Sequence, residues 1–506
     1  MHRHGFRTVE SGGGPGRDAA HLRLGTARRL RDVLVLHRTR PHRRTAGDIA
    51  TAVPMSRLSC PPSDIDRPLS HSERWYWILD AISPLNVVAW VTVAGRVTPE
   101  QLSAAAAAAV AEHPLLRVGI AADTEGTNPR FVPLAEPALP IRTVAADPCD
   151  TTAATREVDA VELCAPIPAS GTLARLVDVV KAAGTPHESH ELILTMSHVI
   201  CDGTSILTLL RRILEYATAT AASPGSRPPG PAVDDRLPAR TRGTARITAS
   251  MLADQLIAAG ARPVRMPAEV PVPPGDRRTR LLTREICGAD LAAVTSACRE
   301  RGVTVHGALT AALATAVARE MTPGRTVRVP VGSPIDFRSE MAVDDGELGS
   351  FVATVPTHPR VGADIDFWDT ARTVIRNLNR RRRFHQHLTA IAGLRLLCPD
   401  SVDRSGRVVD LINTRGPWNV CLTNVGRHGF PDRMGEWRLS GAQFAAGISC
   451  IGHLVSAVNT SHGVLRWNST YVEGLMSPAR ADRIVDDALA MLLTRARPHH
   501  EEHAHD

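Results

Sequence analysis

The sequence has no apolar run long enough to cross a membrane. A transmembrane helix needs about 18 consecutive apolar residues, and the longest candidate is the short alanine-rich stretch Ala104–Ala111. The chain has 506 residues, of which 43% are hydrophobic and 22% charged, as in ordinary globular proteins. This length exceeds one ordinary core and suits two lobes of roughly 200 residues each. We therefore expect a soluble, two-lobed protein that is not transmembrane.

Cysteine lacks the spacing that metal and redox sites need. The nine cysteines contain no C-x-x-C pair, so neither a zinc site nor a dithiol motif is predicted. We expect no bound metal. An odd number of cysteines without a secretion signal is typical of a reducing compartment, which predicts a cytoplasmic protein.

The net charge of +7 belongs to the N-terminal segment. Residues 1–54 contain 11 arginines and four acidic residues, which leaves 48 basic and 48 acidic residues in the remainder. A neutral body gives no support to nucleic-acid binding. We expect residues 1–54 to form a disordered basic leader. Two alternatives stay open: translation starts at Met55 and the leader is not translated, or the leader tethers the protein to an acidic partner or membrane.

A Pro/Arg-rich stretch divides the rest of the chain. Residues 223–242 are rich in Pro, Gly and Arg without apolar periodicity, and a second proline cluster follows at 267–274. We therefore predict an N-terminal lobe at 66–222, a linker at 223–275 and a C-terminal lobe at 276–495. Residues 496–506 are expected to be a disordered, His-rich tail.

Local patterns predict several elements of these lobes. Ser70 and Glu73 have the spacing of a capping box at the start of a helix that continues to Ile82. Thr98 followed by Pro99 predicts a second helix start. Further patterns predict strands at 86–93 and 281–286 and helices at 289–301 and 305–321.

One segment combines a buried strand with candidate catalytic groups. Residues 191–204 read ELILTMSHVICDGT, with His198 at the strand end and Asp202 in the following turn. Gly203 is expected to allow a tight or positive-φ turn, and Thr204 to cap the next helix. Imidazole titrates near neutral pH, so His198 is a candidate base. A core histidine beside an ordinary turn is the alternative.

The segment around His198 resembles the H-H-x-x-x-D-G signature of the condensation-domain acyltransferases, relatives of chloramphenicol acetyltransferase. Five other stretches resemble family motifs in the family's order: the opening helix motif Pro68–Trp77, Gly332–Arg338, Gly349–Val352, Leu422–Gly426 and Thr470–Leu475. The last two resemble motifs of the phthiocerol/phthiodiolone dimycocerosyl transferase branch. The resemblance covers residues 66–495. Two positions depart from it: Ser197 replaces the first His, and Ala353 replaces the Asn of G-x-F-V-N.

The resemblance implies an α/β fold of two chloramphenicol-acetyltransferase-like lobes in a V shape, with an active-site tunnel between them. It implies transfer of an acyl group from a thioester on an acyl carrier protein, a polyketide synthase carrier domain or CoA. The donor would carry phosphopantetheine, no cofactor would be tightly bound, and a long-chain alcohol or diol would accept the acyl group. His198 would act as general base without an acyl-enzyme, and the chain lacks the G-x-S-x-G motif of serine acyl-enzymes. Amide formation and a catalytically silent carrier-binding module are the alternatives.

Further residues receive expected roles around this base. Asp202 is expected to fix the loop through a salt bridge with Arg338, or alternatively to orient His198 directly. Cys201 is read as a buried apolar residue rather than a nucleophile. The oxyanion donor is expected among the backbone N–H groups near Gly203, or on Thr423 or Asn424, unless these two only hold the strand that crosses between lobes.

An arginine-rich run is a candidate docking site for an acidic carrier protein. It comprises Arg376, Arg380, Arg381, Arg382 and Arg383, and a solvated helix face is the alternative. His306 and His453 have no motif support and are read as structural.

Overall fold

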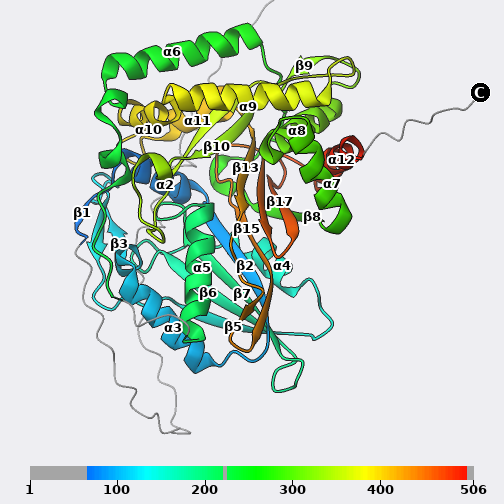
Figure 1. Cartoon of the computed structure of the whole chain (residues 1–506). Helices are drawn as coiled ribbons and strands as arrows, with labels where there is room; N and C mark the ends of the chain where they lie inside the picture. The colour runs from blue at the N-terminus through cyan, green and yellow to red at the C-terminus, as the bar shows by residue number, and fades with distance from the viewer. Residues whose placement is uncertain (1–64, 220–224, 498–506) are drawn as a thin grey trace, which may run out of the picture. The chain divides into compact units, whose positions relative to one another are not determined.

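The computed structural model describes residues 65–219 and 225–497 (Figure 1). The predicted leader 1–54, Met55 and most of the predicted tail lie outside the described residues. Within the described part, no helix is both long and apolar enough to cross a membrane. The fold is mixed α/β, as predicted, with two six-stranded sheets that each carry helices.

The first lobe is built on a sheet with the strand order β14-β15-β2-β7-β6-β5. Only β5 and β6 are parallel neighbours. Helices α3 and α5 share a hydrophobic core with one face of this sheet. The strands are β2 (Asn86–Ala94), β5 (Ile141–Ala146), β6 (Ala174–Lys181), β7 (Ser189–Ser197), β14 (Arg433–Met434) and β15 (Trp437–Ala446). The helices are α2 (His71–Ile82), α3 (Pro99–Glu112), α4 (Ala153–Glu157) and α5 (Gly203–Ala217), and a small sheet holds β1 (Arg67–Pro68), β3 (Val118–Ala121) and β4 (Arg130–Pro133).

The second lobe is built on a sheet with the strand order β11-β10-β13-β16-β17-β8. Its strands are β8 (Thr279–Ile286), β10 (Val331–Asp336), β11 (Val352–Thr357), β13 (Val420–Arg427), β16 (Leu454–Ser461) and β17 (Val464–Val472), and β9 (Val327–Arg328) pairs with β12 (Arg360–Val361). Its helices are α7 (Gly288–Glu300), α8 (Val305–Met321), α9 (Phe367–Arg383), α10 (Gln386–Leu397), α11 (Gly406–Arg415) and α12 (Pro478–Ala496). Residues of α7, α8, α9 and α12 form one core with this sheet.

Strand β15 joins the two lobes. It belongs to the second half of the chain but pairs along β2 of the first sheet. Side chains of the second sheet donate hydrogen bonds to its alternate carbonyls: Asn459 to Ala442 (2.9 Å), Asn468 to Phe444 (2.9 Å) and Thr470 to Ala446 (2.8 Å). Residues 433–446 thus lie in the first sheet, although the predicted first lobe ends at 222. The two sheets therefore cannot be separated by a single cut in the chain. Strand β15 pairs with the edge of β2, which would otherwise be exposed.

The predicted linker contains a helix that the sequence pattern did not predict. Helix α6 (Thr244–Ala261) lies alongside α10 and α9 in Figure 1. Only Ile247 of this helix is buried, so no amphipathic period was visible in the sequence. Tertiary contacts, rather than its own pattern, explain where α6 lies.

The locally encoded elements agree closely with prediction. Ser70 caps α2 with the full capping box, and Thr98 caps α3 ahead of Pro99. The predicted strands at 86–93 and 281–286 are β2 and β8, and the predicted helices at 289–301 and 305–321 are α7 and α8. Each of these predictions is confirmed because its signal lies within a few neighbouring residues.

The hydrogen bonds between the second sheet and β15, which we call the seam, should contribute measurably to stability. Asn468→Ala should lower the free energy of unfolding by about 1–3 kcal/mol, because it leaves the buried Phe444 carbonyl without this donor. Urea denaturation of the two proteins would measure the difference. Asn379→Ala on the exposed face of α9 is the matched control and should change nothing. Equal stability of Asn468→Ala and the wild type would contradict the account of the seam.

Candidate active site

His198 lies where β7 ends, at the start of the loop that leads into α5. Its ring atom Nδ1 lies 2.8 Å from the Cys201 carbonyl oxygen. A carbonyl only accepts hydrogen bonds, so the neutral ring carries its proton on Nδ1. Atom Nε2 then has a free lone pair, and no described residue forms a hydrogen bond with it. The local loop geometry therefore presents a base.

The aromatic ring of Tyr76 covers the imidazole. The two rings are stacked, with centroids 4.3 Å apart and an interplanar angle of 12°. Burial lowers the pKa of His198 from its ordinary 6.5, although the charge of Asp202 opposes this shift. Burial also raises the pKa of Tyr76 to about 12, so its hydroxyl stays neutral. The imidazole is consequently unprotonated at neutral pH. No sequence signal marked Tyr76 for this position.

The Asp202 carboxylate binds groups from three segments and makes no hydrogen bond to His198. Its Oδ1 accepts from Arg338 Nη2 (2.7 Å) and from the Ser205 backbone N–H (2.9 Å). Its Oδ2 accepts from the Phe351 backbone N–H (2.9 Å). The predicted ion pair between Asp202 and Arg338 is thus present. Together with the two backbone N–H groups, it ties the His198 loop to the segments around Arg338 and Phe351. Asp202 also caps α5, so the expectation that Thr204 is the cap was wrong.

Arg338 makes further contacts besides its ion pair with Asp202. Its Nη2 also donates to Ser205 Oγ (2.8 Å), and its Nη1 donates to Asp336 (2.9 Å). Its guanidinium lies 4.8 Å from the centre of the Phe351 ring. Ser205 in turn donates to the Gly349 carbonyl (2.9 Å). Two stretches that resemble family motifs, Gly332–Arg338 and Gly349–Val352, therefore meet the His198 loop through one network.

Gly203 is needed for close packing rather than for an unusual backbone angle. It is absent from the positive-φ residues, so of the two predicted alternatives, a tight turn or a positive φ, the positive φ does not occur. A Cβ at this position would lie 2.6 Å from the Phe444 ring of β15. A side chain here would push the start of α5 away from the strand that joins the lobes.

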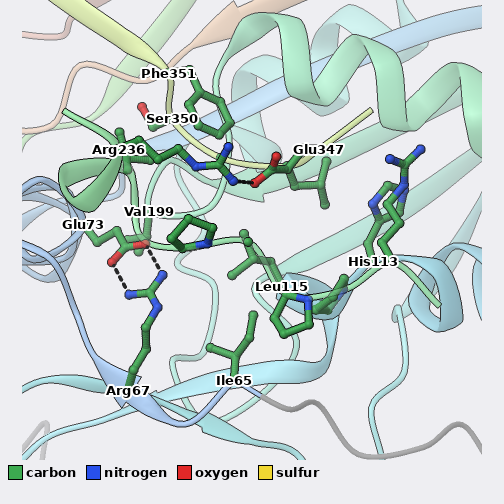
Figure 2. Close-up of a pocket in the computed structure, with 18 of the residues that line it drawn as sticks. Ile65, Arg67, Glu73, His113, Leu115, Val199, Arg236, Glu347, Ser350 and Phe351 are labelled. Atoms are coloured by element: carbon green, nitrogen blue, oxygen red, sulfur yellow. Dashed lines mark hydrogen bonds and ion pairs between the residues drawn. The ribbon is translucent and has the colours of Figure 1, made fainter. Parts of the chain in front are cut away.

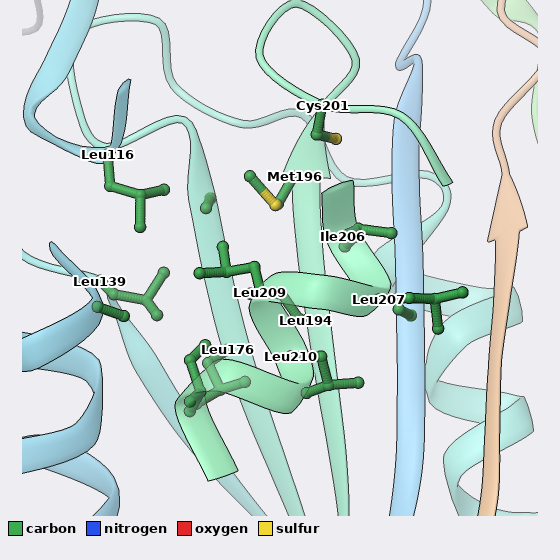
Figure 3. Packing of buried hydrophobic residues seen from close by; sticks show 14 of the residues in the cluster. Leu116, Leu139, Leu176, Leu194, Met196, Cys201, Ile206, Leu207, Leu209 and Leu210 are labelled. Carbon is green, nitrogen blue, oxygen red and sulfur yellow. The ribbon is translucent and has the colours of Figure 1, made fainter. Parts of the chain in front are cut away.

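Cys201 is buried behind the loop. Its thiol donates to the Ser197 carbonyl (3.4 Å), and burial raises its pKa well above 9.0. Figure 3 shows it near Met196 and Ile206 in the core that anchors α5. A thiol with this pKa is a poor nucleophile, in keeping with its reading as a buried apolar residue.

The two candidate oxyanion donors on β13 make no described hydrogen bond to the His198 loop. Asn424 uses its side-chain oxygen to accept the Gly426 N–H (2.8 Å) where the strand has an irregularity. Thr423 lies one residue before it. Their role in oxyanion binding stays a prediction, as does that of the N–H groups near Gly203.

The two departures from the family motifs have simple structural outcomes. Ser197 Oγ lies 3.3 Å from the Asp80 carboxylate and 3.4 Å from the Val199 nitrogen. Ala353 is buried on β11 among apolar side chains. Neither residue contacts the His198 imidazole through a hydrogen bond.

A pocket of about 280 Å³ lies beside the stacked rings. Tyr76 and Val199 line it, together with parts of the linker at 227–233 and of the loop at 344–351. Its three arginines are all in ion pairs: Arg67 with Glu73 (2.7 Å) and Arg236 with Glu347 (Figure 2), and Arg227 with Glu112 (3.0 Å), which lies outside the lining. The remaining lining acid, Asp344, is exposed. Sequence reasoning identified Glu73 only as a helix cap. The residues that line the pocket are far apart in the sequence, so no local pattern indicated it.

The arginine run on α9 is divided by burial. Arg376, Arg380, Arg382 and Arg383 are exposed. Arg381 is buried and forms an ion pair with Asp254 of α6 (2.9 Å). Including Arg381 in a docking surface was therefore wrong, because its charge is used to hold α6 in place.

The Asp202 network yields a paired test of stability. Asp202→Ala should lower the free energy of unfolding by about 3–5 kcal/mol, because Arg338 loses its buried partner. Asp336→Ala removes the other carboxylate on Arg338, which is 42% exposed, and should cost about 1 kcal/mol or less. Denaturation of both variants measures the difference, and similar losses would contradict the central place of Asp202.

Comparisons with known proteins bear on the family and the fold. Residues 283–396 match the family model described as phthiocerol/phthiodiolone dimycocerosyl transferase C-terminus. No curated protein matches the chain by sequence. Among solved structures, polyketide synthase associated protein 5 from Mycobacterium tuberculosis is similar, with 16% identity, a TM-score of 0.58 and coverage of 87% of this chain and 99% of that one.

Condensation domains are similar as well. The first condensation domain of the calcium-dependent antibiotic synthetase has 16% identity and a TM-score of 0.64, over 86% of this chain and 97% of that chain. The condensation domain of monacolin K polyketide synthase has 13% identity and a TM-score of 0.60, over 86% and 98%. At these identities the structures establish the fold. The chain thus has the fold of these condensation domains and of polyketide synthase associated protein 5, and its residues 283–396 are similar to the C-terminal part of phthiocerol/phthiodiolone dimycocerosyl transferases.

Proposed function

We propose that the protein transfers an acyl group from a thioester to an alcohol and so forms an ester in lipid or polyketide biosynthesis. The observation that carries the proposal is the His198 imidazole, whose proton is held on Nδ1 by the Cys201 carbonyl while Nε2 stays free. The donor would be an acyl group on the phosphopantetheine of a carrier protein or of CoA. The acceptor would be a long-chain alcohol or diol.

His198 supplies the proton transfer in this reaction. Nε2 takes the proton from the acceptor hydroxyl as its oxygen attacks the thioester carbonyl carbon. The resulting tetrahedral intermediate collapses, the C–S bond breaks, and the imidazolium returns its proton to the departing sulfur. The products are an ester and a free thiol, and the base is regenerated. No group on the enzyme carries the acyl chain.

The pocket beside Tyr76 suits an uncharged substrate. Its three arginines all lie in ion pairs, and the remaining lining acid, Asp344, is exposed to solvent. A long alkyl chain would therefore not have to bury an unpaired charge. Leu115, Val233 and Leu348 add apolar surface. We assign this pocket to the uncharged part of a substrate that approaches His198.

Acyl transfer by the full chain tests the proposal. Thiol release from medium- and long-chain acyl-CoA would be followed with a long-chain alcohol, with an amine and with neither. His198→Ala should lower alcohol-dependent release by about 10²–10⁴-fold, with its fold checked by circular dichroism. Cys201→Ala is the matched control and should remain active, because the mechanism uses no thiol of the enzyme.

Other outcomes of this assay separate the alternatives. Release that depends on the amine but not on the alcohol would replace the ester by an amide. A folded His198→Ala protein with full activity would refute the base. If no acyl-CoA reacts, a carrier-bound donor is assayed next, and inactivity with it as well would indicate a silent carrier-binding module.

The carrier protein is proposed to dock on the exposed arginines of α9. Carrier proteins present acidic helices, so this contact would be electrostatic and screened by salt. The double variant Arg380→Glu/Arg383→Glu should raise KM for a carrier-bound donor by about tenfold and leave KM for a short thioester unchanged. Raised salt should have the same selective effect.

The control for docking is Arg325→Glu, an exposed arginine in the loop before β9. It changes the net charge at one site away from the α9 run and should leave both KM values unchanged. Equal effects of the α9 variant on the carrier-bound and the short donor would refute docking at this surface.

A further inference from the structure

A second pocket, of about 330 Å³, lies between the residues that precede β8, the end of α11 and the loop before β16. Arg265, Arg277 and His453 line it. Three neutral polar residues, Asn413, Thr414 and Asn419, also line it, and the rest of its wall is apolar: Met266, Pro267, Ala268, Pro271, Val272 and Leu475. No aspartate or glutamate is among its described lining residues. The pocket therefore concentrates positive charge without an acid to balance it.

Arg277 is buried without an acidic partner. It is 5% exposed and donates to the Val272 carbonyl (3.3 Å), the Cys450 carbonyl (2.5 Å) and Asn413 Oδ1 (2.9 Å). These bonds use three of its five N–H groups, and every acceptor is neutral. No described carboxylate lies within ion-pair distance of it. A buried charge in this condition is costly until an anion reaches it.

Arg265 lines the same pocket and likewise forms no described ion pair with a carboxylate. Its one described hydrogen bond goes from Nη2 to the Asn413 carbonyl (3.2 Å), and its Nε is buried without a partner. Burial lowers the pKa of both Arg265 and Arg277. Asn413 thus joins the two guanidinium groups through neutral oxygens where an ion pair would need a carboxylate.

His453 adds a further donor. Its Nδ1 lies 3.3 Å from the side-chain nitrogen of Asn419, which also donates to the Met266 carbonyl. An amide nitrogen only donates, so the ring proton lies on Nε2. Burial lowers the pKa of His453 to about 4, and Arg277, Arg265 and Arg480 act in the same direction. A neutral His453 therefore offers an N–H group.

Two acids beside the segments that line the pocket are bound elsewhere: Glu269 follows Ala268 in the chain, and Glu320 lies near Arg480, which donates to the Pro267 carbonyl. Glu320 pairs with Arg480 and Arg483. Glu269 accepts hydrogen bonds from Ser477 at the start of α12. Neither is among the lining residues of the pocket, so the charge of Arg265 and Arg277 is left for a ligand.

We propose that this second pocket binds a phosphate group, free or as a phosphate ester. Two guanidinium groups match the charge of a phosphate dianion, whereas a carboxylate would balance only one of them. Arginine also binds phosphate oxygens through pairs of N–H groups. Of the two proposed donors, CoA carries a phosphate monoester of this kind, and only this source of the ligand rests on the proposed function.

Calorimetric titration of the full chain with inorganic phosphate tests the site without any measurement of acyl transfer. Arg265→Gln should weaken phosphate binding by about tenfold, and Arg265 is only half-buried, so its replacement is tolerable for folding. Arg278→Gln is the matched control, since this exposed neighbour of Arg277 does not line the pocket. It should bind phosphate as the wild type does.

Three results would overturn the inference: no binding of phosphate to the wild type, equal binding of acetate, or an equal loss in Arg278→Gln. Competition experiments identify the source of the ligand. Displacement of phosphate by CoA but not by pantetheine, which lacks phosphate, would assign the site to the donor. Phosphate binding that CoA leaves unchanged would assign it to free phosphate, and either result supports a phosphate site.

Discussion

The buried carboxylate of Asp202 is the constraint on which the rest of the site depends. Its two oxygens take donors from α5, from Arg338 after β10 and from the Phe351 backbone before β11. Removing any one of these leaves a buried charge or a buried donor without its partner, so the segments hold one another in place. His198 precedes Asp202 by four residues, and its ring is fixed by a carbonyl of the same loop. The nitrogen that we propose as the base is thereby positioned by a contact between the two lobes.

Buried hydrogen bonds also join the two lobes along β15. Asn459, Asn468 and Thr470 of the second sheet bind carbonyls of a strand that belongs to the first sheet. Phe444 of that strand presses on Gly203, at the start of α5. The loop that carries His198 is therefore bounded on one side by the Asp202 network and on the other by β15.

Much of the local structure could be predicted from the sequence, because capping residues and apolar periodicity act over a few positions. Ser70 with Glu73 and Thr98 with Pro99 are examples. The pairing of Asp202 with Arg338 came from the family resemblance, since no spacing in the sequence indicates it. The stacking of Tyr76 on His198, the crossing of β15 and the close contact at Gly203 depend on residues far apart in the chain. The charge of the two pockets could not be predicted for the same reason. Residues far apart in the chain form the ion pairs of the first pocket, and only the fold shows that the arginines of the second pocket have no such partners among the described residues.

The central claim is that the loop holds the His198 proton on Nδ1 and leaves Nε2 free as the base. The most direct test is ¹⁵N NMR of the imidazole in protein labelled at histidine, with His198→Ala used to assign the signal. The account predicts the Nδ1–H tautomer at neutral pH and a protonation midpoint below 6.5, since burial lowers the pKa of this ring. An Nε2–H tautomer, or an imidazole already protonated at neutral pH, would contradict it.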